Sequence, residues 1–140
     1  MSWLPLALVI ALALSGYHVL IKMASPHVSD VLGAVVLQAV AVALGGGLLL
    51  IMAARGDAPE ATGRGLALAA GAGLCVGAAE ILSFVLFSGD LPASRGVPVI
   101  VGATVLMSAL LGAVALREHL SPPQWAGVAL IAVGVLLLAR

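Results

Sequence analysis

Charged side chains are scarce in this sequence of 140 residues, of which only 9% are Asp, Glu, Lys or Arg. A soluble domain is about 25% charged, so this composition, which is 63% hydrophobic, excludes an ordinary globular protein. Six basic residues balance six acidic residues, which leaves no basic surface for nucleic acid. The single cysteine, Cys75, excludes both a disulfide framework and a zinc site.

The signature motifs of common enzyme classes are also missing from the sequence. There is no GxGxxG fingerprint, no Walker loop, no nucleophile elbow and no HExxH helix. We therefore expect a protein that is not an enzyme and that uses neither a cofactor nor a metal.

Long apolar runs make up most of the chain, and each is close to the roughly 20 residues that a helix needs to cross a bilayer. They cover residues 3–22, 30–54, 65–88, 97–116 and 123–139. The first run lacks the positive start of a signal peptide, so we interpret it as a retained span. Lipid offers the backbone no hydrogen-bond partners, which favours helices over strands. We predict an all-α integral membrane protein, with residues 1–140 as one domain of five transmembrane helices in contact with the lipid bilayer.

Glu80 lies well inside the third run, with no basic residue in the same run. An ionised carboxylate at such depth costs several kcal/mol unless it is neutralised, paired or exposed to water. One interpretation is a neutral, hydrogen-bonded residue that stabilises helix packing. The other is a residue that lines a polar cavity and handles substrate or protons, which is the default for an acid inside a membrane.

Several weaker candidates lie on polar faces of the apolar runs. Besides Glu80, the expected substrate- or proton-handling residues are Tyr17, His18, Ser83, Thr104 and Ser108. Lys22 shares a helical face with His18 and can extend to the membrane interface as an ordinary end residue. Gln38 is the one strongly polar side chain of the second run, and we expect it to bond between helices.

Basic residues fall evenly on the two sides of a five-span topology. Three are on the side of the N-terminus and three on the other: Arg55, Arg64 and Arg117 against Lys22, Arg95 and Arg140. The positive-inside rule then sets no orientation, so copies can insert both ways and pair antiparallel. An inverted pair is how many transporters build an alternating-access site. Gly127 and Gly134, seven apart in the last run, are either the dimer contact or generic packing positions.

Two stretches near the C-terminal end carry a family resemblance. Residues 116–127 read LREHLSPPQWAG, and residues 134–138 read GVLLL. They resemble the EamA domain, the repeat unit of the drug/metabolite transporter superfamily, and Glu118 and Gly127 match its characteristic Glu and Gly. The resemblance is strong over residues 65–139 and looser over 1–64. Most such proteins carry two five-helix units, so one unit alone implies assembly from two copies.

The last three runs are also similar to those of small multidrug resistance transporters, whose antiparallel dimers use a glycine-containing last helix as a seam. Those proteins place their essential carboxylate in the first helix, and residues 12–15 of this chain contain no acid. Because Glu80 lies in a different helix, the resemblance does not by itself imply their mechanism of proton-coupled export of cationic drugs.

Taken with the resemblance, these features predict a secondary transporter of a small metabolite in the bacterial inner membrane. It would work by alternating access as a homodimer, with proton coupling through Glu80. The alternatives are a flippase for lipids or lipid-linked sugars, and a non-transporting subunit of a larger membrane complex.

Overall fold

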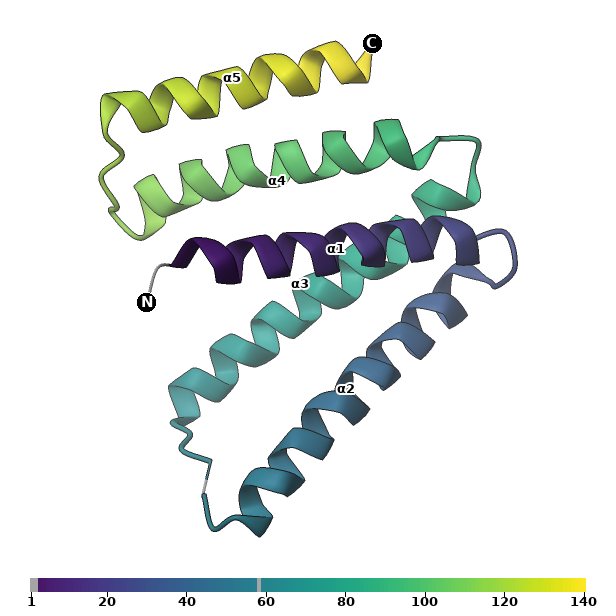
Figure 1. Ribbon diagram of the computed structural model, residues 1–140, viewed down its shortest axis with the longest axis vertical. Helices are drawn as coiled ribbons and strands as arrows, with labels where there is room; N and C mark the ends of the chain where they lie inside the picture. The colour runs from purple at the N-terminus through teal and green to yellow at the C-terminus, as the bar shows by residue number, and fades with distance from the viewer. Residues whose placement is uncertain (1–2, 58) are drawn as a thin grey trace. The chain divides into compact units, whose positions relative to one another are not determined.

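The computed structural model describes residues 3–57 and 59–140, and this part of the chain is all-helical apart from its connections. The helices are α1 (Trp3–Ala24), α2 (Asp30–Ala54), α3 (Gly63–Ser88), α4 (Ala93–Ala115) and α5 (Pro122–Ala139) (Figure 1). All five are long and apolar enough to cross a membrane. The prediction of an all-α membrane fold with five spanning helices is therefore confirmed.

The start of α4 differs most from the sequence prediction. The apolar run begins at residue 97, but the helix begins four residues earlier, at Ala93. Its first turn contains Ser94 and Arg95, which an apolar window does not count. Pro98 then lies inside the helix, where its missing N–H leaves the Ser94 carbonyl without the usual bond from four residues on.

Local side chains and one glycine define where the other helices begin and end. At the start of α3, Thr62 Oγ1 accepts a hydrogen bond from the Gly65 N–H at 3.1 Å. At the start of α5, the Gln124 side chain accepts from the Ser121 N–H at 2.7 Å. Gly56 follows α2 with a φ of 83°, a left-handed conformation that glycine adopts without strain and that closes the helix.

Very few large apolar side chains are buried among the described residues. The buried apolar residues are Ile21, Ala34, Phe84 and Phe87, whereas Leu and Val side chains on every helix are more than half exposed. In water such a surface would aggregate, but in a bilayer it faces lipid tails of the same polarity. The exposed apolar surface is therefore the lipid-contacting surface of a multi-pass membrane protein.

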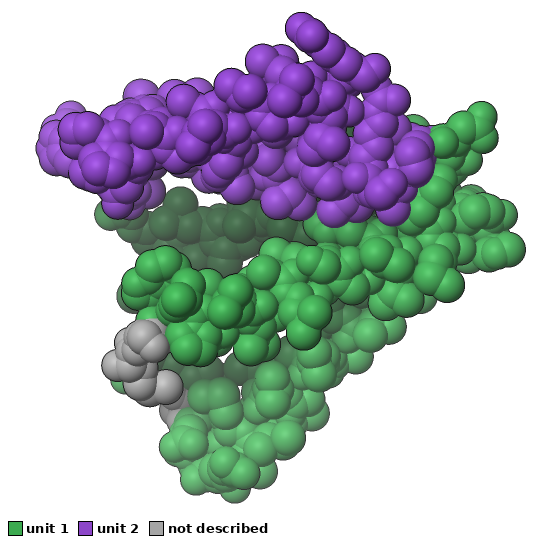
Figure 2. All heavy atoms as spheres, turned by 45° about the horizontal axis from the view of Figure 1, so that its top comes forward, with its two compact units in different colours: residues 1–90 green, residues 91–140 purple. Residues whose placement is uncertain are grey.

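The chain divides into two compact units, residues 1–90 and 91–140, which are coloured separately in Figure 2. In the first unit α3 packs against both α1 and α2. In the second unit α4 and α5 form an antiparallel pair. Gly102 lies at this contact, and a Cβ there would collide with the Val135 side chain of α5. A small residue thus lets the two helices approach closely.

Candidate functional site

Glu80 of α3 and Tyr17 of α1 form a hydrogen bond inside the first unit. The Tyr17 hydroxyl donates to Glu80 Oε2 over 2.5 Å. Glu80 is only 7% exposed, and Tyr17 is half-buried. A buried carboxylate without a partner is strongly disfavoured, and the phenol supplies that partner. The two residues, 63 apart in sequence, therefore form the polar centre of this unit.

Both side chains lie at the same depth in their helices. At 1.5 Å per residue, Glu80 is about 12 Å from the end of α3. Tyr17 is about 10 Å from the end of α1, and the two helix ends meet through Lys22. The pair therefore lies well within a hydrocarbon core of about 30 Å rather than at its surface.

Two other polar side chains lie near this pair. The His18 ring meets the Tyr17 ring edge to face at 4.6 Å between centroids. His18 Nδ1 lies 2.7 Å from the Leu14 carbonyl oxygen, which only accepts, so Nδ1 carries a hydrogen and donates it to that carbonyl. The Gln38 side chain of α2 lies against Gly77, one turn before Glu80, where a Cβ would come within 3.5 Å of Gln38 Nε2.

Ser83, one turn after Glu80, is half-buried on α3. Helix packing thus brings Tyr17 to Glu80, with His18 against Tyr17 and Gln38 against Gly77. Ser83 is near Glu80 because it lies one turn further along the same helix. Of these, Gln38 was expected only to bond between helices. Its contact with Gly77 depends on the packing of α2 against α3, which spacing within one helix does not reveal.

Lys22 joins the end of α1 to the end of α3 beside this centre. Its Nζ donates to the carbonyl oxygens of Phe87 at 2.9 Å and Gly89 at 2.8 Å. Buried Ser25 also donates to the Phe87 carbonyl, at 2.8 Å. A cation at a helix C-terminus is favoured by the helix dipole as well as by the two bonds. Lys22 is therefore a helix-capping residue, a role that its position at the end of an apolar run does not indicate.

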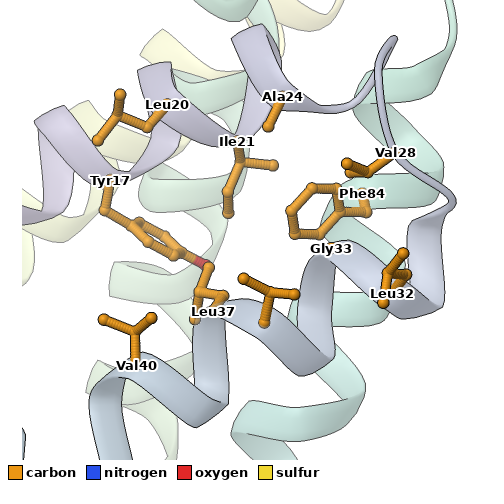
Figure 3. A pocket seen from close by; sticks show the side chains of 11 residues that line it. Tyr17, Leu20, Ile21, Ala24, Val28, Leu32, Gly33, Leu37, Val40 and Phe84 are labelled. Carbon is orange, nitrogen blue, oxygen red and sulfur yellow. The ribbon is translucent and has the colours of Figure 1, made fainter. Parts of the chain in front are cut away.

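An apolar cavity of about 430 Å³ lies between α1 and α2, which we call the α1–α2 hollow (Figure 3). Its walls share aliphatic or aromatic character, and they are formed by Tyr17, Leu20, Ile21, Ala24, Val28, Leu32, Gly33, Val36, Leu37, Val40 and Phe84. The Tyr17 hydroxyl is the one polar side-chain atom among these residues. The same hydroxyl bonds to Glu80, so Tyr17 lines the hollow and also contacts the buried acid.

Phe84 forms the inner wall of the hollow by packing onto Gly33 of α2. A Cβ at position 33 would lie 2.5 Å from Phe84 Cε1 and 2.7 Å from Cζ. The Phe84 side chain is 3% exposed. Gly33 thus lets α2 approach α3 closely. In the sequence, a small residue apart from the other glycines of the second run is the feature that indicates such a helix contact.

The remaining site candidates lie on the second unit. Thr104 is exposed on α4, and its hydroxyl donates to the Ile100 carbonyl at 2.9 Å. Ser108 is exposed one turn further along the same helix. On α5 Gly127 is exposed and Gly134 half-buried, and no part of α4 lies within 4 Å of a Cβ built on either. The two glycines therefore do not form the contact between α4 and α5.

Glu118 lies in the turn between α4 and α5. Its Oε2 lies 2.8 Å from where a Cβ on Gly112 would be, and its N–H donates to the Gly112 carbonyl at 3.1 Å. Arg117 turns the chain back through a positive φ of 57°. Arg95 performs at α5 the role that Lys22 has at α3, since it donates to the carbonyl oxygens of Leu138 and Ala139, both at 2.9 Å.

Five spanning helices with an acid–phenol pair buried among three of them define a multi-pass membrane protein with a polar intramembrane centre. The profile of the EamA-like transporter family matches residues 1–140. The chain therefore belongs to the EamA-like transporter family, within the drug/metabolite transporter superfamily, and its class is that of membrane transporters. No curated protein and no solved structure matches the chain.

Proposed function

We propose that this chain is a secondary transporter of a small metabolite, that two copies form its working unit, and that they operate by alternating access. The hydrogen bond between Tyr17 and buried Glu80 carries this proposal. Acids are retained inside membranes chiefly where they serve substrate or ion pathways, and the family is one of transporters. We assign substrate and proton handling to Glu80 with Tyr17, His18 and Ser83. We also assign this role to Thr104 and Ser108 of α4.

Proton coupling is consistent with the chemistry of the acid–phenol pair. Glu80 Oε2 accepts a hydrogen bond from the Tyr17 hydroxyl, and an ionised carboxylate can make this bond. A protonated Glu80 retains an acceptor oxygen and gains an O–H donor, so the pair stays satisfied in either state. Glu80 can therefore take up or release a proton without leaving a buried polar group unpaired. If a proton and a substrate compete for this site, binding of one releases the other. Such competition couples substrate transport to proton transport.

The charge distribution supports an inverted pair of copies. Five spans place the two termini on opposite sides of the membrane, and three basic residues lie on each side. Without an orientation signal, both insertions form and two opposite copies can create a site at the midplane. In this proposal residues 1–140 act as one transport unit, Gly127 and Gly134 lie at the contact between copies, and the membrane is the bacterial inner membrane.

The test is transport by the purified protein in proteoliposomes. An imposed pH gradient is combined with a mixture of small metabolites, and uptake is followed by mass spectrometry of the vesicle contents. We expect accumulation of a defined metabolite by the wild-type chain and none above empty vesicles for Glu80→Gln. Glu60→Gln, which changes an exposed acid in the loop after α2, is the matched control and should transport normally. Equal accumulation by Glu80→Gln would contradict the assignment of Glu80.

One observation favours a second candidate, a flippase for lipids or lipid-linked sugars. The walls of the α1–α2 hollow are apolar apart from Tyr17, which suits a hydrocarbon chain. Such a protein would move a fluorescent lipid between leaflets of a proteoliposome without accumulating any water-soluble metabolite. Solute accumulation without lipid movement would exclude this candidate.

A further inference from the structure

We infer that Tyr17 selects the substrate: the α1–α2 hollow holds the apolar part of a hydrogen-bond donor, a primary amine above all, whose N–H group donates to the Tyr17 oxygen. This inference rests on the proposed transport function and names the substrate class of its site. It makes Tyr17 a specificity-determining residue, placed between the hollow and Glu80.

The walls of the hollow require a largely apolar ligand. Ten of the lining side chains offer no polar atom, and the volume of about 430 Å³ is that of a small-molecule site. Polar groups of a ligand buried against these walls would lose their water without compensation. Among the lining side chains, the Tyr17 hydroxyl alone can form a hydrogen bond with a polar group of the ligand.

The hydrogen bond to Glu80 decides what kind of group can meet that hydroxyl. A phenol has one hydrogen to donate, and Tyr17 donates it to Glu80 Oε2. Toward the hollow the Tyr17 oxygen therefore offers lone pairs alone, so it accepts a hydrogen bond but cannot give one. A ligand whose polar group only accepts, such as a carboxylate, would place two acceptors face to face.

Charge adds a preference for an ammonium group over a neutral donor. Glu80 accepts the hydrogen bond of the phenol, so its ionised form would place a negative charge next to the Tyr17 oxygen, and Tyr17 and Phe84 add aromatic rings to the walls of the hollow. The nearest cation on α1, Lys22, is held by two carbonyl oxygens at the end of α3. His18 directs its Nδ1 hydrogen to Leu14. A negative charge on Glu80 would therefore attract a cation to the phenol, and the aromatic rings of the hollow add to that attraction.

The experiment observes Tyr17 directly, because it is the single tyrosine of the chain. The full chain is labelled with 3-fluorotyrosine, reconstituted in nanodiscs and followed by fluorine NMR. Three probes share one aromatic body: 2-phenylethylamine, its N,N,N-trimethyl derivative, and phenylacetate. The amine is a cation with N–H donors, the trimethyl compound is a cation without them, and phenylacetate only accepts.

We expect the amine to shift the fluorine resonance saturably and to bind about tenfold more tightly than the trimethyl compound, as one charge-assisted hydrogen bond would give. Phenylacetate should leave the resonance unchanged. By calorimetry, Tyr17→Phe should bind the amine and the trimethyl compound equally, because the acceptor is gone. Val36→Phe fills the hollow and should abolish binding, whereas Val35→Phe, one residue away and outside the hollow, should not.

Equal binding of the amine and the trimethyl compound would overturn the inference, since charge alone would then decide. Tighter binding of phenylacetate would overturn it as well. If no probe shifts the resonance while Glu80-dependent solute transport persists, the hollow holds lipid chains only and the inference fails although the transport proposal stands. If the amine binds as expected but the vesicles transport nothing, the transport proposal is the one that fails.

Discussion

Replacing Gly33 by Ala tests whether the contact between α2 and α3 is as close as the structure has it. The new Cβ would lie 2.5, 2.7 and 2.9 Å from Phe84 Cε1, Cζ and Cδ1. Ordinary contact needs a separation greater by about 1 Å, and the Phe84 ring is buried with little room to move. Overpacking of this kind costs about 1–3 kcal/mol of stability.

A matched control removes the effect of helix propensity. Gly16→Ala adds the same methyl group to α1, where no atom lies within 4 Å. Both substitutions gain up to about 1 kcal/mol from helix propensity, so their difference isolates the collision. We therefore expect Gly33→Ala to be less stable than Gly16→Ala by about 1–3 kcal/mol.

The assay is the free energy of unfolding, measured by titration with SDS in mixed lipid–detergent micelles. Phe84→Leu removes ring atoms from the collision, so the double variant Gly33→Ala/Phe84→Leu should be more stable than the sum of the single effects. A coupling energy of about 0.5–3 kcal/mol is typical of residues in direct contact. If Gly33→Ala is as stable as Gly16→Ala, or if the two effects simply add, the close approach of α2 and α3 is refuted.

Three further predictions concern the helix ends, the topology and the contact between copies. Lys22→Met removes two hydrogen bonds to α3 carbonyls and should lower the free energy of SDS unfolding by about 1–3 kcal/mol, with partial recovery in Lys22→Arg; an unchanged value would make Lys22 an ordinary interfacial residue. Reporter fusions to the C-terminus should give signal on both sides of the membrane, and two lysines added to the loop of residues 55–62 should move the population to one orientation; a single native orientation would exclude the antiparallel pair. Gly127→Leu or Gly134→Leu should weaken dimerisation, measured by single-molecule counting in liposomes, before folding is affected; an unchanged dimer would assign both glycines to another role.

The helices themselves follow from the sequence because lipid leaves the backbone no alternative to internal hydrogen bonds. Hydropathy therefore located all five spans, and the largest error was at α4, whose first turn contains Ser94 and Arg95. The Arg95 side chain binds a carbonyl oxygen at the end of α5, a contact 43 residues away that no local window detects. The sequence thus predicts which segments are helical better than where polar helix ends lie.

The candidate site was predictable in its components but not in its pairing. The sequence points to Glu80 because a lone acid in an apolar run is costly, and to Tyr17 because it adjoins the polar face of the first run. That Tyr17 donates to Glu80, and that Gln38 lies against Gly77, depends on how three helices pack. In a soluble protein, the apolar face of each helix indicates which side packs against its neighbours. Here apolar side chains lie on every side of each helix and few described side chains are buried, so the sequence does not indicate which faces meet.

The central claim, that Glu80 exchanges a proton for substrate, is tested most directly by proton release on ligand binding. A metabolite that raises the unfolding temperature of the wild-type protein is added to the purified chain in weakly buffered detergent solution, and the change in pH is recorded with an indicator dye. We predict that wild-type protein releases protons as the ligand saturates, and that Glu80→Gln, folded to the same degree by circular dichroism, releases none. Equal proton release by the two proteins, or saturable binding to the wild type without any release, would contradict the claim.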